Sequence, residues 1–235
     1  MQINMSETEN LSVNQIREME IFVHGDFGPS GAIALRLAKA ALDSLGLDRE
    51  KIHALWTIFI ISEIPHEDFL DTLQILTGCT IVNDRLIIKD YRKYALTIMR
   101  ADTKEAVRVR VKPSAFKSDI KPVFEKLLKL RRQIAETISG KESLKTEFYK
   151  IKGELAGKIL KMPRDQLVEV NRVKLFEFPK VGPSCDFLNY EQVECAVCGE
   201  SVYDLKARLK DGKIVCISCS GEDAYYQLSS KHVSA

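Results

Sequence analysis

The chain has 235 residues, of which 45% are hydrophobic and 29% are charged, and 35 basic against 33 acidic residues give a formal net charge of +2. With this near balance, bulk electrostatics favour no particular partner, and no apolar run is long enough to cross a bilayer. Residues 1–20 contain no hydrophobic signal region, and four of the six cysteines are spaced like metal ligands rather than like a secreted disulfide framework. We therefore expect a cytoplasmic protein with one sizeable core and a small appendage.

The N-terminal segment is predicted to be a loose leader over residues 1–15, followed by a turn and a helix. Three glycines and a proline fall within residues 24–31, which favours a constrained turn. Apolar residues then recur at helical spacing over residues 32–45 and stop at Gly46. The turn thus leads into a helix N-terminus, whose free amides can bind an anion, a carboxylate or a cofactor group, although many such turns only pack closely.

The following segments predict a sheet with helices on one face. Residues 54–62 are β-branched and aromatic and indicate a buried strand, and residues 66–76 are helix-like and end before Gly78. Three more strands are expected from apolar and alternating patterns, at residues 86–91, 95–100 and 106–112, with a hairpin connection at 102–105. We expect an α+β core domain with an antiparallel sheet over residues 16–116.

Residues 117–178 are predicted to form a helical hairpin and an extended connector. Apolar stripes at helical spacing occupy residues 118–161, and Gly140 divides them into two antiparallel helices. The connector follows at residues 167–178. Because an apolar stripe on a helix pair often packs against its own copy, we expect a homodimer. The basic run at residues 126–132 could touch nucleic acid, but it is more typical of the solvated face of an amphipathic helix.

The last segment, residues 179–235, carries two Cys-x-x-Cys pairs, which are the most specific motif of the chain. Each pair places two thiolates on one tight turn, and tetrahedral Zn²⁺ takes four sulfurs at about 2.3 Å. Between the pairs, Asp211-Gly212 predicts a tight turn that joins two short strands, and residues 221–228 could begin a helix. This order is that of a treble-clef zinc finger. Two disulfides, two redox pairs or an iron site are alternatives, but the spacing favours structural Zn²⁺ bound by Cys195, Cys198, Cys216 and Cys219.

The sequence resembles the formylmethanofuran dehydrogenase FmdE family over most of its length. The resemblance is carried by the four-cysteine finger and by four segments of the core: His24-Gly25 with Pro29, Leu76-Thr-Gly-Cys-Thr80, Lys89-Asp-Tyr91 and Val107-Arg-Val-Arg-Val-Lys-Pro113. It implies an α+β core followed by an auxiliary treble-clef finger. It also implies a place in the first step of methanogenesis, where a molybdenum or tungsten enzyme reduces CO₂ onto methanofuran, with components of that enzyme as partners.

The chain departs from the family pattern in the core motif. The family's entry motif reads His-Gly-His-x-Cys-Pro-Gly, whereas this chain has Asp26 in place of the second histidine and Gly28 in place of the cysteine. Asp68 stands where family members often carry another cysteine. An aspartate cannot replace a thiolate in redox or covalent chemistry. The core motif is therefore degenerate.

The candidate catalytic residues of the core are His24, Asp26 and Cys79. His24 could be a ligand or a general base, or it could only hold the turn by hydrogen bonds. With Asp26 it could contribute to a harder N/O metal site, together with His66, Asp68 or Asp71. Cys79 could line the same cleft, or it could be buried and inert.

We therefore expect a zinc-binding accessory protein of the FmdE type, because the sequence has no molybdopterin motif and no iron–sulfur cysteine run beyond the finger. One alternative makes the core a small-molecule or metal-dependent enzyme with a cleft around His24. Another makes the finger and the basic run a nucleic-acid or transcription adaptor, which the net charge near zero makes the weakest hypothesis.

Overall fold

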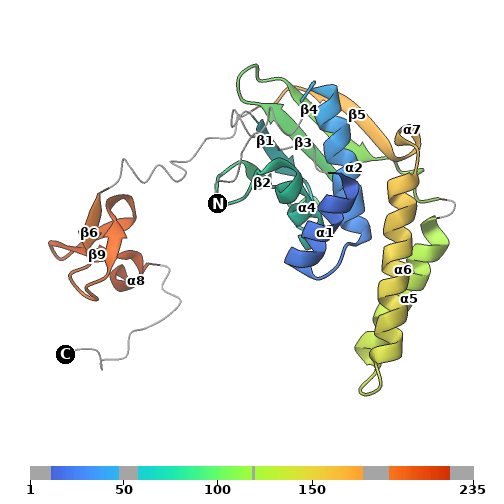
Figure 1. The fold of residues 1–235 in the computed structure, drawn as a ribbon. Helices are drawn as coiled ribbons and strands as arrows, with labels where there is room; N and C mark the ends of the chain where they lie inside the picture. The colour runs from blue at the N-terminus through green and yellow to red at the C-terminus, as the bar shows by residue number, and fades with distance from the viewer. Residues whose placement is uncertain (1–11, 48–57, 118–119, 177–190, 223–235) are drawn as a thin grey trace, which may run out of the picture. The chain divides into compact units, whose positions relative to one another are not determined.

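The computed structural model describes residues 12–47, 58–117, 120–176 and 191–222, apart from the side chains of His24 and Leu205. The chain divides into two compact units, Met1–Gly182 and Pro183–Ala235 (Figure 1). Within the described ranges, no helix combines the length and the apolar character that crossing a membrane requires.

The first unit is built on a five-stranded open sheet, which confirms the α+β class. The strand order is β2-β1-β3-β4-β5. The strands are, in chain order, β1 (Ile58–Ser62), β2 (Leu86–Ile88), β3 (Ala95–Arg100), β4 (Ala106–Val111) and β5 (Val168–Val173). The β3–β4 pair is the predicted antiparallel hairpin, and β1 pairs antiparallel with β3 on the other side.

The sheet is mixed rather than wholly antiparallel, which corrects the prediction at one edge. Strand β2 lies parallel to β1, with Ile60 opposite Leu86. The physical reason is the connection, because helix α4 (Glu67–Thr77) carries the chain back to the starting end of β1 before β2 begins. Strand β2 also ends at Ile88, earlier than predicted, and the backbone amide of Tyr91 bonds instead to the carbonyl of Glu63.

The predicted leader also contains the start of a helix, α1 (Val13–His24). Ser12 and Gln15 form a capping box, in which each side chain accepts a hydrogen bond from the other residue's backbone amide. Ile16, one residue later, is fully buried. The cap and this apolar anchor explain why the helix begins inside residues 1–15.

Helix α2 (Pro29–Ser44) is the central element of the first unit. Proline at its first position suits a helix start, and its alanines at 32, 34, 38 and 41 are fully buried. These small side chains let α2 lie close to β3, β4 and β5 on one side and to α4 and α6 on others. On the opposite face of the sheet, Phe59, Met99 and Ala106 form a second, smaller apolar cluster.

The predicted helical hairpin is present as α5 (Ile120–Glu136) and α6 (Glu142–Lys161), which lie side by side in Figure 1. The short helix α7 (Arg164–Leu167) follows. The prediction of an extended connector at 167–178 is wrong for residues 168–173, because they form β5 and pair antiparallel with β4. The hairpin is therefore inserted between two neighbouring strands of the core sheet.

The second unit contains two small hairpins. Strands β6 (Gln192–Glu194) and β7 (Ser201–Tyr203) form the first hairpin. A short 3₁₀ helix, η3 (Asp204–Lys206), leads to the second hairpin, which is formed by β8 (Ala207–Lys210) and β9 (Lys213–Cys216). Asp211 and Gly212 both have positive φ, as the predicted tight turn requires. Helix α8 (Ile217–Ser220) ends at Gly221, so the helix starts earlier than predicted, and residues 223–228 of that prediction lie outside the described ranges.

Candidate functional site

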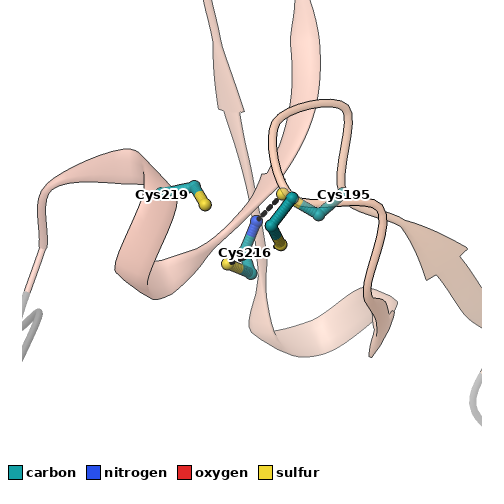
Figure 2. Close-up of side chains that lie close together, drawn as sticks. Cys195, Cys216 and Cys219 are labelled. Atoms are coloured by element: carbon teal, nitrogen blue, oxygen red, sulfur yellow. Dashed lines mark hydrogen bonds between the residues drawn. The ribbon is translucent and has the colours of Figure 1, made fainter. Parts of the chain in front are cut away.

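The second unit brings together the four cysteines that the sequence singles out. The sulfur atoms of Cys195, Cys198, Cys216 and Cys219 all lie within 4.8 Å of one another. Figure 2 shows Cys195, Cys216 and Cys219 around one centre, with the amide of Cys216 donating to the sulfur of Cys195 at 3.3 Å. The first pair comes from the loop between β6 and β7, and the second from the end of β9 and from α8.

Backbone amides prepare this cluster for anionic sulfur. Gly199 adopts a φ of +74°, which glycine tolerates, and its amide bonds to the carbonyl of Cys195 at 2.8 Å. Burial disfavours the thiolate of Cys195, but the amides of Cys198, Cys216 and Val197 outweigh it and lower the pKa of Cys195 to about 6. A hydrogen bond with Cys216 raises the pKa of Cys219 to about 12. These amides therefore favour the thiolate form of Cys195.

The donor set fits a tetrahedral metal ion. Four thiolates at about 2.3 Å from one ion would lie about 3.8 Å apart, and the sulfurs of Cys198 and Cys216 are 3.9 Å apart. Cys195 and Cys216 are buried, and the other two are half-buried. The cluster can therefore hold one metal ion with little movement.

In the first unit, the glycine-rich turn and helix α4 bring Asp26 and Asp68 together around a lysine. The ammonium of Lys152, on α6, lies 2.8 Å from both carboxylate oxygens of Asp26 and 3.4 Å from Oδ2 of Asp68. Burial disfavours the charged ammonium, but the carboxylates of Asp26 and Asp68 outweigh it and raise the pKa of Lys152 above its ordinary value. Asp26 and Asp68 thus hold one protein cation between them.

Gly28, the other altered position of the motif, makes room for this arrangement. A Cβ atom at Gly28 would lie 2.3 Å from Oδ2 of Asp68 and 2.3 Å from Cε of Lys152. Any larger residue there would push against the ion pairs. The residues at positions 26, 28 and 68 are therefore physically matched to the lysine.

Next to these charges lies a small hydrogen-bonded group at the start of α2. The hydroxyl of Ser30 is 2.8 Å from the hydroxyl of Tyr94 and 3.3 Å from Nε2 of His66. The other ring nitrogen of His66, Nδ1, is buried and makes no hydrogen bond within the described part of the chain. These polar groups can orient a polar ligand.

Both polar groups line a cavity of about 860 Å³ between the helical hairpin and the core. This volume is within the range of small-molecule sites. Its lining includes the polar and charged residues Asp26, Asp68, Lys152, Ser30, His66 and Tyr94, together with apolar and aromatic residues such as Phe116, Phe124, Leu128, Phe148, Tyr149 and Leu155. Lys121 and Arg131 of α5 also reach it.

Two further candidates of the core, Cys79 and Asp71, are not among the described residues that line this cavity. Cys79 is 2% exposed, its thiol donates to the carbonyl of Ile58 at 3.8 Å, and burial raises its pKa to about 11. It is a buried structural thiol at the far end of α4 from Asp68. Asp71 accepts a hydrogen bond from Gln74 at 3.3 Å. The side chain of His24 lies outside the described part of the structure.

A buried carboxyl behind the turn completes this region. Glu20 is fully buried, accepts a hydrogen bond from the hydroxyl of Thr72, and lies so close to Gly31 that a Cβ there would be 2.3 Å from its Oε1. Burial raises the pKa of Glu20 to about 8, and the charges of Asp68, Asp71 and Asp26 add to this rise. Glu20 therefore keeps its proton at neutral pH.

Sequence reasoning did not identify Lys152, Ser30 or Tyr94. Lys152 is 126 residues from Asp26 in the chain and sits in a run of ordinary helix residues, so no local signal marks it. Among the described residues, the four cysteines alone form a group of three or more potential ligands close enough to share an ion. Asp26 and Asp68 contact an ammonium group instead.

Comparison with known proteins agrees with this architecture. The sequence model of the family described as FmdE, molybdenum formylmethanofuran dehydrogenase operon, matches residues 23–169. A crystal structure of a tungsten formylmethanofuran dehydrogenase FmdE-like protein from Syntrophus aciditrophicus has the same fold, with a TM-score of 0.53 and 23% identity over 92% of this chain and 96% of that one.

A curated relative from Archaeoglobus fulgidus, a probable S-adenosyl-L-methionine-binding protein, is 28% identical over 214 residues. That match includes 89% of this chain but 53% of the relative, so the chain spans about half the length of the curated relative it matches. The family match extends over more than half of the chain and contains strands β1 to β4, the turn and the hairpin. The chain belongs to the FmdE family.

Proposed function

We propose that this protein is a cytoplasmic, zinc-binding accessory protein of the FmdE type, in which the four-cysteine cluster holds one Zn²⁺. The observation that carries the proposal is the convergence of four sulfurs within 4.8 Å. A metal surrounded by four thiolates has no open position for a substrate, which is typical of structural zinc. Its role would be to fold the second unit.

The zinc proposal is tested by removing the metal from the full chain with a chelator. Because binding to such a site contributes folding energy directly, we expect residues 191–222 to lose their dispersed amide signals in NMR spectra while the β1–β5 sheet keeps its own. Added Zn²⁺ should restore the spectrum. A second unit that stays folded after complete removal of the metal would contradict the proposal.

The accessory role concerns formylmethanofuran dehydrogenase and one-carbon metabolism in methanogenesis. It is supported by the family's description and by the FmdE-like neighbour. We expect the full chain to co-elute with purified molybdenum or tungsten formylmethanofuran dehydrogenase in size-exclusion chromatography. Separate elution at concentrations of tens of micromolar would exclude a stable complex.

The cavity of the first unit supports a second candidate function, the binding of a small molecule. The A. fulgidus relative suggests S-adenosylmethionine as the first ligand to test. Leu128 lines the cavity and is 37% exposed, so the larger side chain of Leu128→Trp should obstruct the cavity. Ile138→Trp is the matched control, because Ile138 is fully exposed and lies outside the cavity lining. We expect calorimetric binding of S-adenosylmethionine to be lost only in the first variant; equal binding by both would place the site elsewhere.

A homodimer remains part of the proposal. It is supported by partly exposed apolar residues on the hairpin, Phe124, Leu128 and Tyr149. Light scattering after size-exclusion chromatography should give about twice the chain mass.

The nucleic-acid alternative gains no support from α5, where Lys126 contacts Glu147 at 2.8 Å and Lys121 contacts Glu125 at 3.8 Å.

A further inference from the structure

We propose that the end of strand β4 carries a further, smaller binding site, which takes a dianionic phosphate group. The site is a depression of about 280 Å³ in the first unit, and four basic residues line it. They are Lys93, Arg108, Arg110 and Lys112. The inference does not depend on the ligand of the large cavity, because none of these four residues lines that cavity.

The alternation of β4 places its basic side chains on one face of the sheet. Side chains two residues apart in a strand point to the same side. Val107 and Val109 are fully buried in the core on the side of α2, so Arg108 and Arg110 point to the opposite face. Lys112 follows at the same spacing, directly after the last residue of the strand. The pattern that buries the valines therefore gathers the cations.

The two arginines have carboxylate partners. Arg108 donates to both oxygens of Glu63, at 2.6 and 2.7 Å, and Glu63 is 6% exposed, so these two charges cancel. Arg110 donates through one amino group to Glu169 at 2.7 Å. Its other guanidinium N–H groups make no hydrogen bond within the described part of the chain, and they remain available to a ligand.

The two lysines contact no carboxylate among the described residues. The ammonium of Lys112 donates to the backbone carbonyl of Asp165 at 2.5 Å, and that of Lys93 lies 5.8 Å from the centre of the Tyr91 ring. The four cations and the two carboxylates that contact them therefore leave two positive charges at the depression.

Both the charge and the size of the depression favour a phosphate group. A phosphate monoester carries a charge of about −1.5 to −2 at pH 7 and three acceptor oxygens, whereas a carboxylate would neutralise only one of the two charges. Sites that enclose a whole small molecule have volumes of about 300–1,000 Å³. A depression of about 280 Å³ suits one charged group instead.

Two aromatic residues extend the lining beyond the basic side chains. They are Tyr94 and Phe116, and both also line the large cavity. Apolar surface next to the cations can accept the organic part of a ligand. The site therefore suits the phosphate group of an organic ester as well as a free phosphate ion.

The test follows the amide signals of the full chain by NMR while sodium phosphate is added at a constant ionic strength of about 0.15 M. We expect the signals of residues 93–95 and 110–112 to shift. Lys112→Met should weaken binding about three- to tenfold, because one cation is lost. Glu169→Gln should strengthen it, because a carboxylate that competes for Arg110 is removed. Lys126→Met, at an exposed lysine outside the lining, should leave binding unchanged.

Phenyl phosphate, titrated in the same way, separates the two sources of the group. Binding of either compound supports the site, and the tighter one shows whether the ligand is an organic ester or the free ion. Acetate, a monoanion, should bind at least about fivefold more weakly than phosphate.

Three results would each overturn the inference. They are equal affinities for acetate and phosphate, no shift at residues 110–112 with either phosphate compound, and a folded Lys112→Met chain that binds phosphate as tightly as the wild type. If Lys112→Met does not fold, Glu169→Gln decides, and unchanged or weaker phosphate binding by that variant would contradict the proposal.

Discussion

Replacing Lys152 with methionine removes the ammonium that holds α6 against the glycine-rich turn. The ammonium lies 2.8 Å from Asp26 and 3.4 Å from Asp68, whose side chain is 2% exposed. Removing one partner of a fully buried ion pair costs about 3–5 kcal/mol. Lys152 and Asp26 keep 17% and 22% exposure, so water recovers part of this, and we expect a loss of about 2–4 kcal/mol.

The same substitution at Lys126 is the matched control. Lys126 contacts Glu147 on the same hairpin at the same distance, 2.8 Å, but both side chains are about half exposed. Exposed pairs contribute about 0–1 kcal/mol. Burial is thus the main difference between the two substitutions.

Urea unfolding of the full chain, followed by circular dichroism, measures both variants. Lys152→Met should clearly lower the urea concentration at the midpoint of unfolding, and Lys126→Met should hardly change it. The double variant Lys152→Met/Asp68→Asn should recover part of the lost stability, because the charge of the buried carboxylate is then also removed. If Lys152→Met unfolds at the same urea concentration as Lys126→Met, the ion pairs at the turn do not contribute as argued.

Three further predictions concern the same unit. The pKa of Glu20 is about 8 in the folded chain, against an ordinary value of 4.5, so between these values the folded chain keeps a proton that the unfolded chain loses. The free energy of unfolding should therefore fall from about pH 5 to pH 8. A Glu20→Gln variant whose free energy of unfolding falls equally steeply with pH would contradict this. Gly31→Ala should destabilise the chain by about 1–3 kcal/mol, because the added methyl group presses on Glu20. Gly157→Ala, whose Cβ meets nothing within 4 Å, should stabilise the chain by about 0.5–1 kcal/mol. Thermal denaturation measures both variants, and equal changes in their melting temperatures would refute the close contact at Gly31. Cys79 should react with iodoacetamide only after denaturation, as peptide mass spectrometry would show, and rapid modification of the folded chain would disprove its burial.

The finger could be predicted from sequence because its determinants are local. Two Cys-x-x-Cys pairs fix the ligand spacing, and Asp211-Gly212 fixes the turn between β8 and β9, where both residues have positive φ. The position of helix α8 could not be predicted in the same way, because a glycine such as Gly221 can stand at either end of a helix in a sequence pattern. In the structure it has a φ of 90° and ends α8.

The core was harder to predict because its critical contacts are distant in the chain. Residues 168–173 become a strand only through pairing with β4, across the whole inserted hairpin. Strand β2 lies beside β1 rather than β3 because α4 reverses the path. The partner of Asp26 and Asp68, Lys152, comes from α6, and no local pattern links these residues.

Metal content per chain, measured by elemental analysis on the wild type and on a Cys195→Ser/Cys198→Ser variant, tests the central proposal most directly. We predict one zinc per wild-type chain and none in the variant, because the cysteine cluster holds the ion and the Asp26–Asp68 pair contacts Lys152 instead. A wild-type chain without zinc, or an equivalent of metal that survives in the variant, would contradict the account.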